Sequence, residues 1–487
     1  MKIVVCHCNK RGCVLLYIVT SEKTVHEKKD TGETGKMNIV IVGDGKVGAA
    51  LTEHLSHEGH DVVVIDKDPR VVEEMVNAYD VLGLCGNGAS YDVQMEAGVD
   101  KARLLIAATS SDELNIFCCL VAKKIGAHHT IARVRNPEYA KQLHFFKEEL
   151  GLSLVVNPEF AAANEIARVL RFPTAINVES FAGDRVDMAE IQLKSDNPLS
   201  GMCVYEIPKR FKSRVLICAV QRGEEIYIPN GDFRLQANDR IHITSKRSDM
   251  VAFMKELGIY RHRTKHVLIA GGGKMGYYLA RQLSETGHKV KVIEIDPARA
   301  EHLANLLPHA TVVWGDGSDR AVLLEQGLDN QDAFVSLTTI DEENIITTMY
   351  ASSIGVGKTV AKVNRVSYDI LRSIGIETTI SSKTVAANQI IGYVRALENS
   401  GSSSVQTLYK LVNDRVEALE FRIAAEDAFY LGSTLKELQL RDNVIIGCIL
   451  RKGKIIYPCG EDTIENGDSV TVITSHHGFK NFEEIFC

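Results

Sequence analysis

The residues of this chain that are best placed to do chemistry form two glycine-rich loops. The loops lie 228 residues apart and read Gly43-Asp44-Gly45-Lys46-Val47-Gly48 and Gly271-Gly272-Gly273-Lys274-Met275-Gly276. An apolar run typical of a buried parallel strand precedes the first loop, at residues 38–42. In such a loop the first glycine allows a tight turn, the second lets the backbone approach a pyrophosphate, and the third packs the next helix on the sheet. The loops therefore predict two sites at which a helix N-terminus binds phosphate.

A carboxylate follows each loop at the same distance. Asp66 and Glu294 lie 23 residues after the first glycine of their loop, at the end of a second apolar run. This fold uses an acid at that place to accept hydrogen bonds from ribose hydroxyls. Because an acid there disfavours a 2′-phosphate, we expect NAD or another adenosine nucleotide rather than NADP. The alternative is a glycine turn that serves the fold alone.

The duplication continues into a fourth and a fifth strand. These strands are expected at residues 104–109 and 130–134 in the first copy, and at 333–338 and 359–363 in the second. Arg133 and Lys362 lie near the ends of the fifth strands, at the carboxyl edge of the sheet where ligands bind. A cation there could meet phosphate, or it could form an ordinary surface ion pair.

Two acids, Asp112 and Asp341, follow the fourth strands where helical segments begin. A short acceptor at a helix start satisfies orphan backbone amides. We therefore expect both acids to be helix N-caps rather than catalytic groups.

A shorter module follows each nucleotide domain and repeats as well. Arg222 and Arg451 keep an offset of 229 residues, and so do Asp239 and Asp468. Each module has about 80 residues, which is typical of a binding or assembly module and small for a catalytic domain. The two modules share no Ser-His-Asp, Cys-His or paired-carboxylate set, so no catalytic residue is assigned.

The predicted fold class is α/β, with two doubly wound Rossmann-like parallel-sheet domains, each followed by a small α+β module. The expected boundaries are 37–175 and 265–398 for the nucleotide domains, and 176–260 and 405–487 for the modules. Helices at 157–171 and 381–398 end the two nucleotide domains. Their apolar faces could cover a sheet or pair subunits, and the sequence does not separate these possibilities.

Residues 1–36 belong to neither repeat and are expected to form a disordered extension. Cys6-His7-Cys8 and Cys13 lack a second ligand pair of suitable spacing, so no metal site is predicted.

Composition narrows the classes of protein further. The chain has 487 residues, 45% of them hydrophobic, and a formal net charge of −7, so it carries no basic footprint for nucleic acid. No apolar run is long enough to span a bilayer, so any membrane association must go through a partner protein. The 11 cysteines show no paired spacing and are expected to be reduced thiols.

The order of domains, a nucleotide domain and then a small module repeated twice, resembles the regulatory subunit of Trk-type bacterial potassium uptake systems, built from two regulator-of-potassium-conductance units. The resemblance runs from about Met37 to the C-terminus. It implies a cytoplasmic protein that is peripheral to the cell membrane and assembles as a tetrameric ring on a membrane-embedded potassium-transporting subunit. It also implies that NAD(H), ATP or ADP changes the ring and so gates potassium flux.

Ligand contacts carried over from the resemblance fall on matching positions of the two copies. They are Gly43, Asp44, Gly45, Lys46, Val47, Asp66, Thr109, Ser110 and Arg133 in the first copy, and Gly271, Gly272, Gly273, Lys274, Met275, Glu294, Thr338 and Lys362 in the second.

Two positions depart from the pattern. Asp44 puts a carboxylate between the glycines, which is tolerable only if its side chain faces away from phosphate. Lys362 stands where the first copy has Arg133, and lysine lacks arginine's bidentate fork. The two sites are therefore expected to differ in ligand preference.

The alternative function is a soluble NAD-dependent oxidoreductase with a duplicated cofactor domain. It needs a proton donor or acceptor beside the nicotinamide. His128, His129 and His144 are the candidates in the first copy, but the second copy has no histidine at the matching positions. The duplication also leaves no dedicated substrate domain.

Overall fold

The structure is a computed structural model that describes most of the chain. The described residues are 2–9, 12–19, 36–139, 142 and 147–487, except 173–174, 177, 183–184, 261–263, 366–370, 372–373, 377, 400–404, 413–414, 425–427, 477–478 and 480. The chain divides into two compact units, one of residues 1–162 with 381–394, the other of residues 163–380 with 395–487. Of the sequence-based expectations, those for His144 and for residues 20–35 lie outside the described residues.

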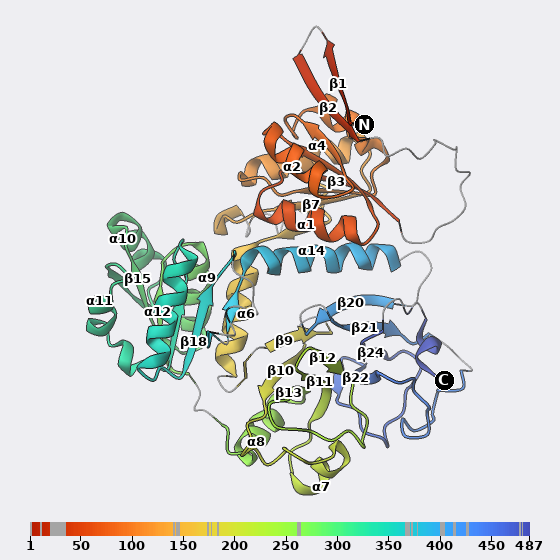
Figure 1. Cartoon of the computed structure of the whole chain (residues 1–487), viewed down its shortest axis with the longest axis vertical. Coiled ribbons are helices and arrows are strands. Elements are labelled where there is room, and N and C mark those ends of the chain that lie inside the picture. Colours follow the sequence, from red (N-terminus) through yellow and green to blue (C-terminus); the bar gives the residue numbers. More distant parts are fainter. Residues whose placement is uncertain are drawn as a thin grey trace. The chain divides into compact units, whose positions relative to one another are not determined.

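The first unit is built on a parallel sheet in the order β5-β4-β3-β6-β7-β8 (Figure 1). Its elements are β3 (Asn38–Val42), α1 (Lys46–His57), β4 (Asp61–Asp66), α2 (Pro69–Ala78), β5 (Leu82–Cys85), α3 (Tyr91–Glu96), η1 (Val99–Lys101), β6 (Leu104–Ala107), α4 (Asp112–Ile125), β7 (His129–Arg133) and β8 (Leu154–Val156). The strand order reverses between β3 and β6, which makes the carboxyl ends of these strands a topological switch point where ligands bind. The predicted doubly wound fold is confirmed.

Part of the N-terminal extension is regular structure. Strands β1 (Lys2–Asn9) and β2 (Gly12–Val19) form an antiparallel hairpin. Strand β2 pairs with the edge strand β5, with Leu16 opposite Leu84. Disorder was expected for residues 1–36. Residues 2–9 and 12–19 form strands instead, because the hairpin can pair with the edge strand of the first sheet.

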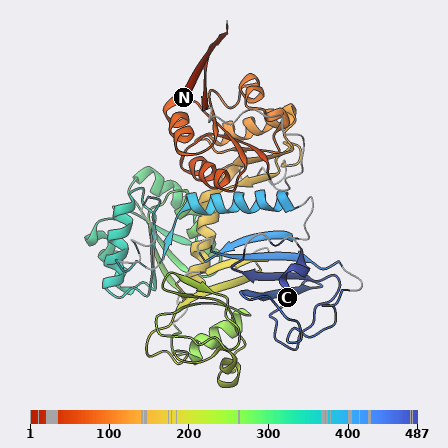
Figure 2. The same ribbon diagram turned by 45° about the vertical axis from the view of Figure 1, so that its right-hand side comes forward.

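The helix that ends the second copy contributes to the first unit. In α14 (Ser382–Asn399), the stretch up to Val394 belongs to this unit, and it lies along the first domain (Figures 1 and 2). The Tyr393 hydroxyl lies 3.2 Å from Nδ1 of His129 at the start of β7. Ile390 and Val394 are buried. One helix of the second copy therefore covers part of the first domain.

The second unit contains the other nucleotide domain, whose sheet has the matching order β16-β15-β14-β17-β18-β19. Its elements are β14 (His266–Ala270), α9 (Lys274–Glu285), β15 (Lys289–Glu294), α10 (Pro297–Leu306), β16 (Ala310–Trp314), α11 (Arg320–Glu325), η3 (Leu328–Asn330), β17 (Ala333–Ser336), α12 (Asp341–Ser353), β18 (Lys358–Lys362) and β19 (Thr379–Ile380). Helix α6 (Pro158–Arg171) enters this unit from the first.

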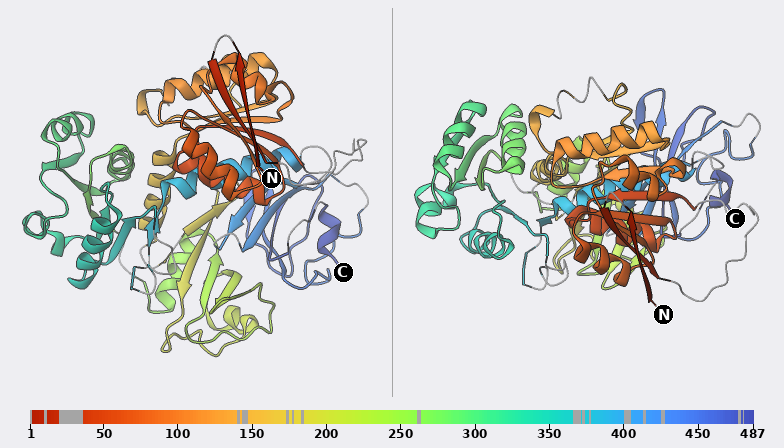
Figure 3. Two further views of the ribbon diagram at one scale, coloured as in Figure 1. Left: turned by 45° about the horizontal axis from the view of Figure 1, so that its top comes forward. Right: turned by 90° about the horizontal axis from the view of Figure 1, so that it is seen from above.

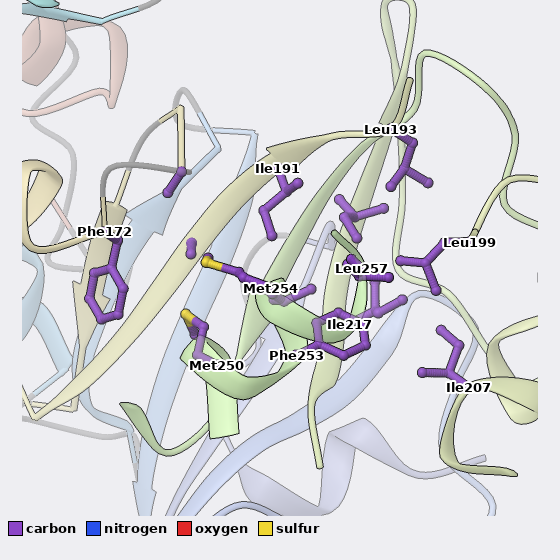
Figure 4. Close-up of a cluster of buried hydrophobic side chains, with 14 of the residues drawn as sticks. Phe172, Ile191, Leu193, Leu199, Ile207, Ile217, Met250, Phe253, Met254 and Leu257 are labelled. Atoms are coloured by element: carbon purple, nitrogen blue, oxygen red, sulfur yellow. The ribbon is translucent and has the colours of Figure 1, made fainter. Parts of the chain in front are cut away.

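The two small modules also match each other strand by strand. The first has the sheet order β12-β11-β13-β10-β9 and the second β23-β22-β24-β21-β20. The first comprises β9 (Val178–Phe181), β10 (Val186–Gln192), η2 (Val204–Glu206), α7 (Ile207–Arg210), β11 (Leu216–Arg222), β12 (Glu225–Tyr227), β13 (Arg240–Thr244) and α8 (Arg247–Glu256), and the second β20 (Val405–Leu411), β21 (Val416–Arg422), β22 (Val444–Arg451), β23 (Lys454–Ile456), β24 (Ser469–Thr474) and η4 (Phe482–Ile485). In the first module, Met250, Phe253 and Met254 of α8 pack into its apolar core (Figure 4).

The small modules share one apolar core between their sheets, which lie side by side in Figure 3. Phe181 and Cys218 of the first module pack in the same cluster as Val412 and Ile473 of the second. The backbone amide of Val412 donates to both carboxylate oxygens of Glu179, at 3.1 and 2.9 Å. Val412 has a φ of 52°, which is rare for a β-branched residue. A carboxylate of one module thus fixes a strained turn of the other.

The repeated arginine and aspartate positions of the small modules form ion pairs. Arg222 binds Asp239 through two hydrogen bonds of 2.8 Å, and Arg451 binds Asp468 in the same way at 2.9 and 2.8 Å. Both aspartates are 1% exposed. Each arginine also binds a loop, because Arg222 donates to the carbonyl of Arg234 at 2.9 Å and Arg451 donates to that of Thr463 at 2.7 Å.

Removing the buried half of one pair should destabilise its module. We expect Asp239→Ala to lower the free energy of unfolding by about 3 kcal/mol, because the Arg222 charge then loses its partner. Urea denaturation followed by circular dichroism measures the change. The control is Asp232→Ala, which removes an exposed acid of the same module; equal losses in the two variants would contradict the expectation.

Candidate nucleotide-binding sites

Two of the three glycines of the first loop are sterically required, and the other is not. Gly43 has a φ of +86°, and a Cβ there would lie 2.7 Å from Cγ2 of Thr109. A Cβ at Gly48 would lie 2.2 Å from the carbonyl oxygen of Gly43, so α1 packs tightly under the loop. A Cβ at Gly45 would meet nothing within 4 Å. The first and third glycines are needed by the fold, whereas the second faces open space.

The acid at the end of the second strand holds the glycine loop. Oδ2 of Asp66 accepts from the amide of Asp44 at 2.8 Å, and Oε2 of Glu294 accepts from the amide of Gly272 at 2.9 Å. The other oxygen of each acid accepts from the turn that follows, from Asp68 in the first copy and from Asp296 in the second, both at 3.0 Å. The predicted role was to bind ribose; the structure adds a role in holding the loop. Each carboxylate oxygen retains a lone pair for a hydroxyl donor.

The helices that follow the loops begin without a side-chain cap. The N-cap residues of α1 and α9 are Gly45 and Gly273, and neither offers a capping side chain. The neighbouring helices α2 and α10, by contrast, are capped by Asp68 and Asp296. The first-turn amides of α1 and α9 are therefore left as donors for an anion.

The side chains that follow the N-cap residues differ in exposure. Lys46 and Lys274 are exposed at the helix starts. Val47 and Met275 are 4% and 6% exposed. The latter two can offer a ligand their backbone amides only.

A buried asparagine joins two strand ends at each site, and the sequence interpretation did not assign it. Oδ1 of Asn115 accepts from the backbone and hydroxyl of Thr109 at 2.8 and 2.7 Å, and its Nδ2 donates to the carbonyl of Arg133 at 2.9 Å. Asn344 binds the backbone of Thr338 and Lys362 in the same way. The matching Asp-Glu-x-Asn sequences of the two copies were the signal available.

The two cations lie where the sequence placed them, at the carboxyl edge. Nη1 of Arg133 lies 3.4 Å from the carbonyl oxygens of Ala108 and Thr109. Its Nε is buried without a hydrogen-bond partner, and burial lowers the pKa of this guanidinium. Lys362 reaches the carbonyl oxygen of Leu337 at 3.4 Å. Ser110 is exposed, and its carbonyl accepts from Arg135.

The prediction that Asp112 and Asp341 are N-caps is wrong. Ser111 is the N-cap of α4, and Ile340 is that of α12. Oδ2 of Asp112 accepts instead from the amides of Arg135 and Asn136 at 2.9 and 2.7 Å, in the loop after β7. Asp341 binds the matching loop at 2.8 and 2.9 Å. Both acids are 6% exposed and position the loop that borders the site.

Asp44 turns its side chain into the domain. Its Oδ1 accepts from the Thr52 hydroxyl on α1 at 3.0 Å, and its Oδ2 is buried without a partner. The residue is 6% exposed. Burial raises the pKa of Asp44 to about 6, the Thr52 hydrogen bond offsets part of this rise, and the charge of Asp66 adds to it. The carboxylate is therefore tolerated in the loop because it is turned toward α1.

Neutralising Asp44 should stabilise the first unit at pH 7.5. Its pKa is higher in the folded than in the unfolded chain, so the folded state gains stability as the pH falls through 6 toward 3.8. Asp44→Asn removes the charged form and should raise stability at pH 7.5 by about 2 kcal/mol, with a smaller gain at pH 5. Thermal unfolding at both pH values measures this. The exposed Asp92→Asn is the control, and a gain that does not depend on pH would contradict the assignment.

The two histidine candidates that the structure describes, His128 and His129, lie away from this edge, at the start of β7. His129 begins β7 and Arg133 ends it, so they are about 13 Å apart along the strand. His129 Nδ1 faces Tyr393 and Ser153.

Within the described ranges, no group of three or more His, Cys, Asp or Glu could hold a metal ion, and no helix is long and apolar enough to cross a membrane.

The fold and sites define a class of protein with two Rossmann-like domains, each paired with a small β-rich module. The TrkA-N domain model matches residues 39–158 and 267–382, and the TrkA-C domain model matches residues 188–258 and 418–486. The chain belongs to the family of Trk system potassium uptake proteins of the TrkA type.

Relatives match over nearly the whole chain. A Trk system potassium uptake protein TrkA homolog of Archaeoglobus fulgidus is 32% identical over 92% of this chain and 100% of its own length. The TrkA protein of Haemophilus influenzae is 29% identical over 92% of this chain and 98% of its own.

Solved structures share the fold at lower identity. The GsuK channel has a TM-score of 0.59 and 20% identity, and covers 91% of this chain and 77% of its own. A GsuK channel bound to NAD has a TM-score of 0.58 and 19% identity, and covers 92% of this chain and 79% of its own.

Proposed function

We propose that this chain is a non-catalytic, nucleotide-binding regulatory subunit that gates a membrane-embedded potassium transporter. The observation that carries the proposal is the repeated site, in which an uncapped helix follows a glycine loop that a strand-end carboxylate holds. Relatives that match over 92% of this chain are named as Trk system potassium uptake proteins. The subunit acts at the cytoplasmic face of the membrane through its partner.

The ligand is NAD(H) or an adenine nucleotide, ATP or ADP. A phosphate group fits the first-turn amides of α1 and α9, and the ribose hydroxyls donate to Asp66 or Glu294. Arg133, at the carboxyl end of β7, meets the second phosphate of the first site. The GsuK structure bound to NAD, which shares the fold, supports this ligand class.

Gating requires that the ligand bind two arrangements of the assembly unequally. A shift from 10% to 90% active takes about 2.6 kcal/mol of differential binding energy. A few charge-assisted hydrogen bonds to phosphate supply that much. No covalent step is needed, and His129 at the opposite edge of the sheet does not support hydride chemistry at the site.

Exposed apolar side chains at matching positions of the two nucleotide domains support assembly into a ring. Met95 and Phe117 of α3 and α4 are 38% and 53% exposed, and the matching Leu324 and Ile346 of α11 and α12 are 39% and 66% exposed. Large exposed apolar side chains that recur in both copies suit contacts between subunits. We propose a homo-oligomeric ring, tetrameric as in the family resemblance.

A side chain added at the second glycine of either loop should abolish nucleotide binding at that site and leave the other site intact. We expect Gly45→Val and Gly273→Val each to remove one nucleotide-binding event, with an affinity loss of at least about tenfold, because the added side chain occupies the space left for phosphate. Isothermal calorimetry with NADH, ATP and ADP counts the events. Each variant controls for the other, and circular dichroism checks the fold. Asp66→Ala is a less specific probe because Asp66 also holds the loop.

The gating role is tested in the host membrane. The tagged chain should recover a multi-spanning potassium transporter from detergent-solubilised membranes, with a yield that changes between NADH, ATP and ADP. The double variant Gly45→Val, Gly273→Val should recover the transporter with a yield that no longer responds to nucleotide. Recovery of no membrane protein under any nucleotide would overturn the proposed function.

A further inference from the structure

The second nucleotide site has an exposed aromatic ring beside its ribose-binding acid. Trp314 ends β16, and its Cα is the register partner of Glu294 at the end of β15. The residue is 70% exposed, although tryptophan is usually largely buried. The adjacent Ile295 is 63% exposed. An exposed aromatic and an exposed aliphatic side chain therefore lie next to the buried carboxylate of Glu294, the proposed ribose ligand.

Contacts with the chain hold the ring in this position. Nε1 of Trp314 donates to the carbonyl oxygen of Ile295 at 3.2 Å. The amide of Gly315 donates to the carbonyl oxygen of Glu294 at 3.0 Å, which ties the two strand ends together. Arg299 on α10 lies 3.5 Å from Oε1 of Glu294 and adds a second planar group beside the same acid. The hydrogen bond fixes one edge of the indole, and because Trp314 is 70% exposed, ring surface remains available for stacking.

The first site has the same backbone arrangement with different side chains. Asp66 is the register partner of Cys85, and the amide of Gly86 donates to the Asp66 carbonyl at 2.9 Å. Cys85 Sγ contacts the carbonyl oxygen of Lys67 at 3.6 Å, as Trp314 contacts that of Ile295. A lysine and a cysteine replace the isoleucine and the tryptophan. The two sites thus share the carboxylate that holds the glycine loop and the uncapped helix, and they differ in the side chains beside that carboxylate.

We propose that Trp314 is a stacking platform for the nucleobase of the ligand in the second site, and that the first site lacks it. The proposal rests on the proposed nucleotide function. A nucleotide whose ribose binds Glu294 extends its base away from the phosphates and past the strand ends, where Trp314 and Ile295 lie. Stacking depends on the area of the base, so the second site selects purine over pyrimidine nucleotides more strongly than the first.

Fluorescence tests this contact directly, because Trp314 is the single tryptophan of the chain. The experiment uses the Gly45→Val protein, in which the first site no longer binds nucleotide and only the second site is observed. ADP should quench the tryptophan emission of this protein along the same binding curve that calorimetry gives. NADH should quench it further, by energy transfer to the nicotinamide. Emission that stays constant while calorimetry reports saturation would overturn the stacking proposal and leave the proposed function intact.

Substitution tests the energetic contribution. In the Gly45→Val background, Trp314→Ala should weaken ADP binding by about tenfold and UDP binding by less, while Trp314→Phe retains most of the affinity for ADP. In the Gly273→Val background, where the first site is observed, Trp314→Ala should leave ADP affinity unchanged. Equal losses for ADP and UDP would assign Trp314 a structural role and overturn the proposal.

Absence of any nucleotide binding at the second site in the Gly45→Val protein would overturn both this proposal and the proposed nucleotide binding at the second site.

Discussion

The carboxylate at the end of the second strand is the interaction on which both sites depend. Asp66 and Glu294 each bind an amide of the glycine loop and an amide of the following turn. They fix the loop against the strand, and the loop fixes the start of the uncapped helix. The same carboxylate is thus a structural clamp and the ribose ligand of the proposed site. Binding a nucleotide therefore acts on the group that holds the loop in shape.

Much of the fold could be predicted from the sequence because parallel strands buried on both faces are uninterrupted apolar runs. Strand β3 has the expected boundaries, 38–42, and the positions that keep the offset of 229 residues include both members of the Arg222–Asp239 and Arg451–Asp468 ion pairs. Helix caps were harder to predict, because serine and aspartate are adjacent at the start of α4 and either can cap. Ser111 does so, and Asp112 binds a distant loop.

The candidate sites could be predicted in part for the same reason. The strand-end positions follow from sheet topology, so the ligand edge carries the predicted glycines, acids and cations. The direction of a side chain does not follow from its position: Asp44 is turned toward Thr52, and Trp314 is turned toward Ile295. Asn115 was overlooked because an asparagine inside a helical stretch carries no signal of the two strand ends that it joins.

The apolar core shared by the two small modules has a consequence for how the duplicated sites diverged. Phe181 and Val412 pack in one cluster, so separating the two modules would expose that apolar surface to water. The fusion therefore fixes the ratio of first to second sites at one to one in every molecule. In a pair of identical single-unit chains, any substitution would appear in both sites at once. A single chain can instead keep an aspartate in one loop and a glycine in the other, so that the two halves specialise independently while remaining in equal number.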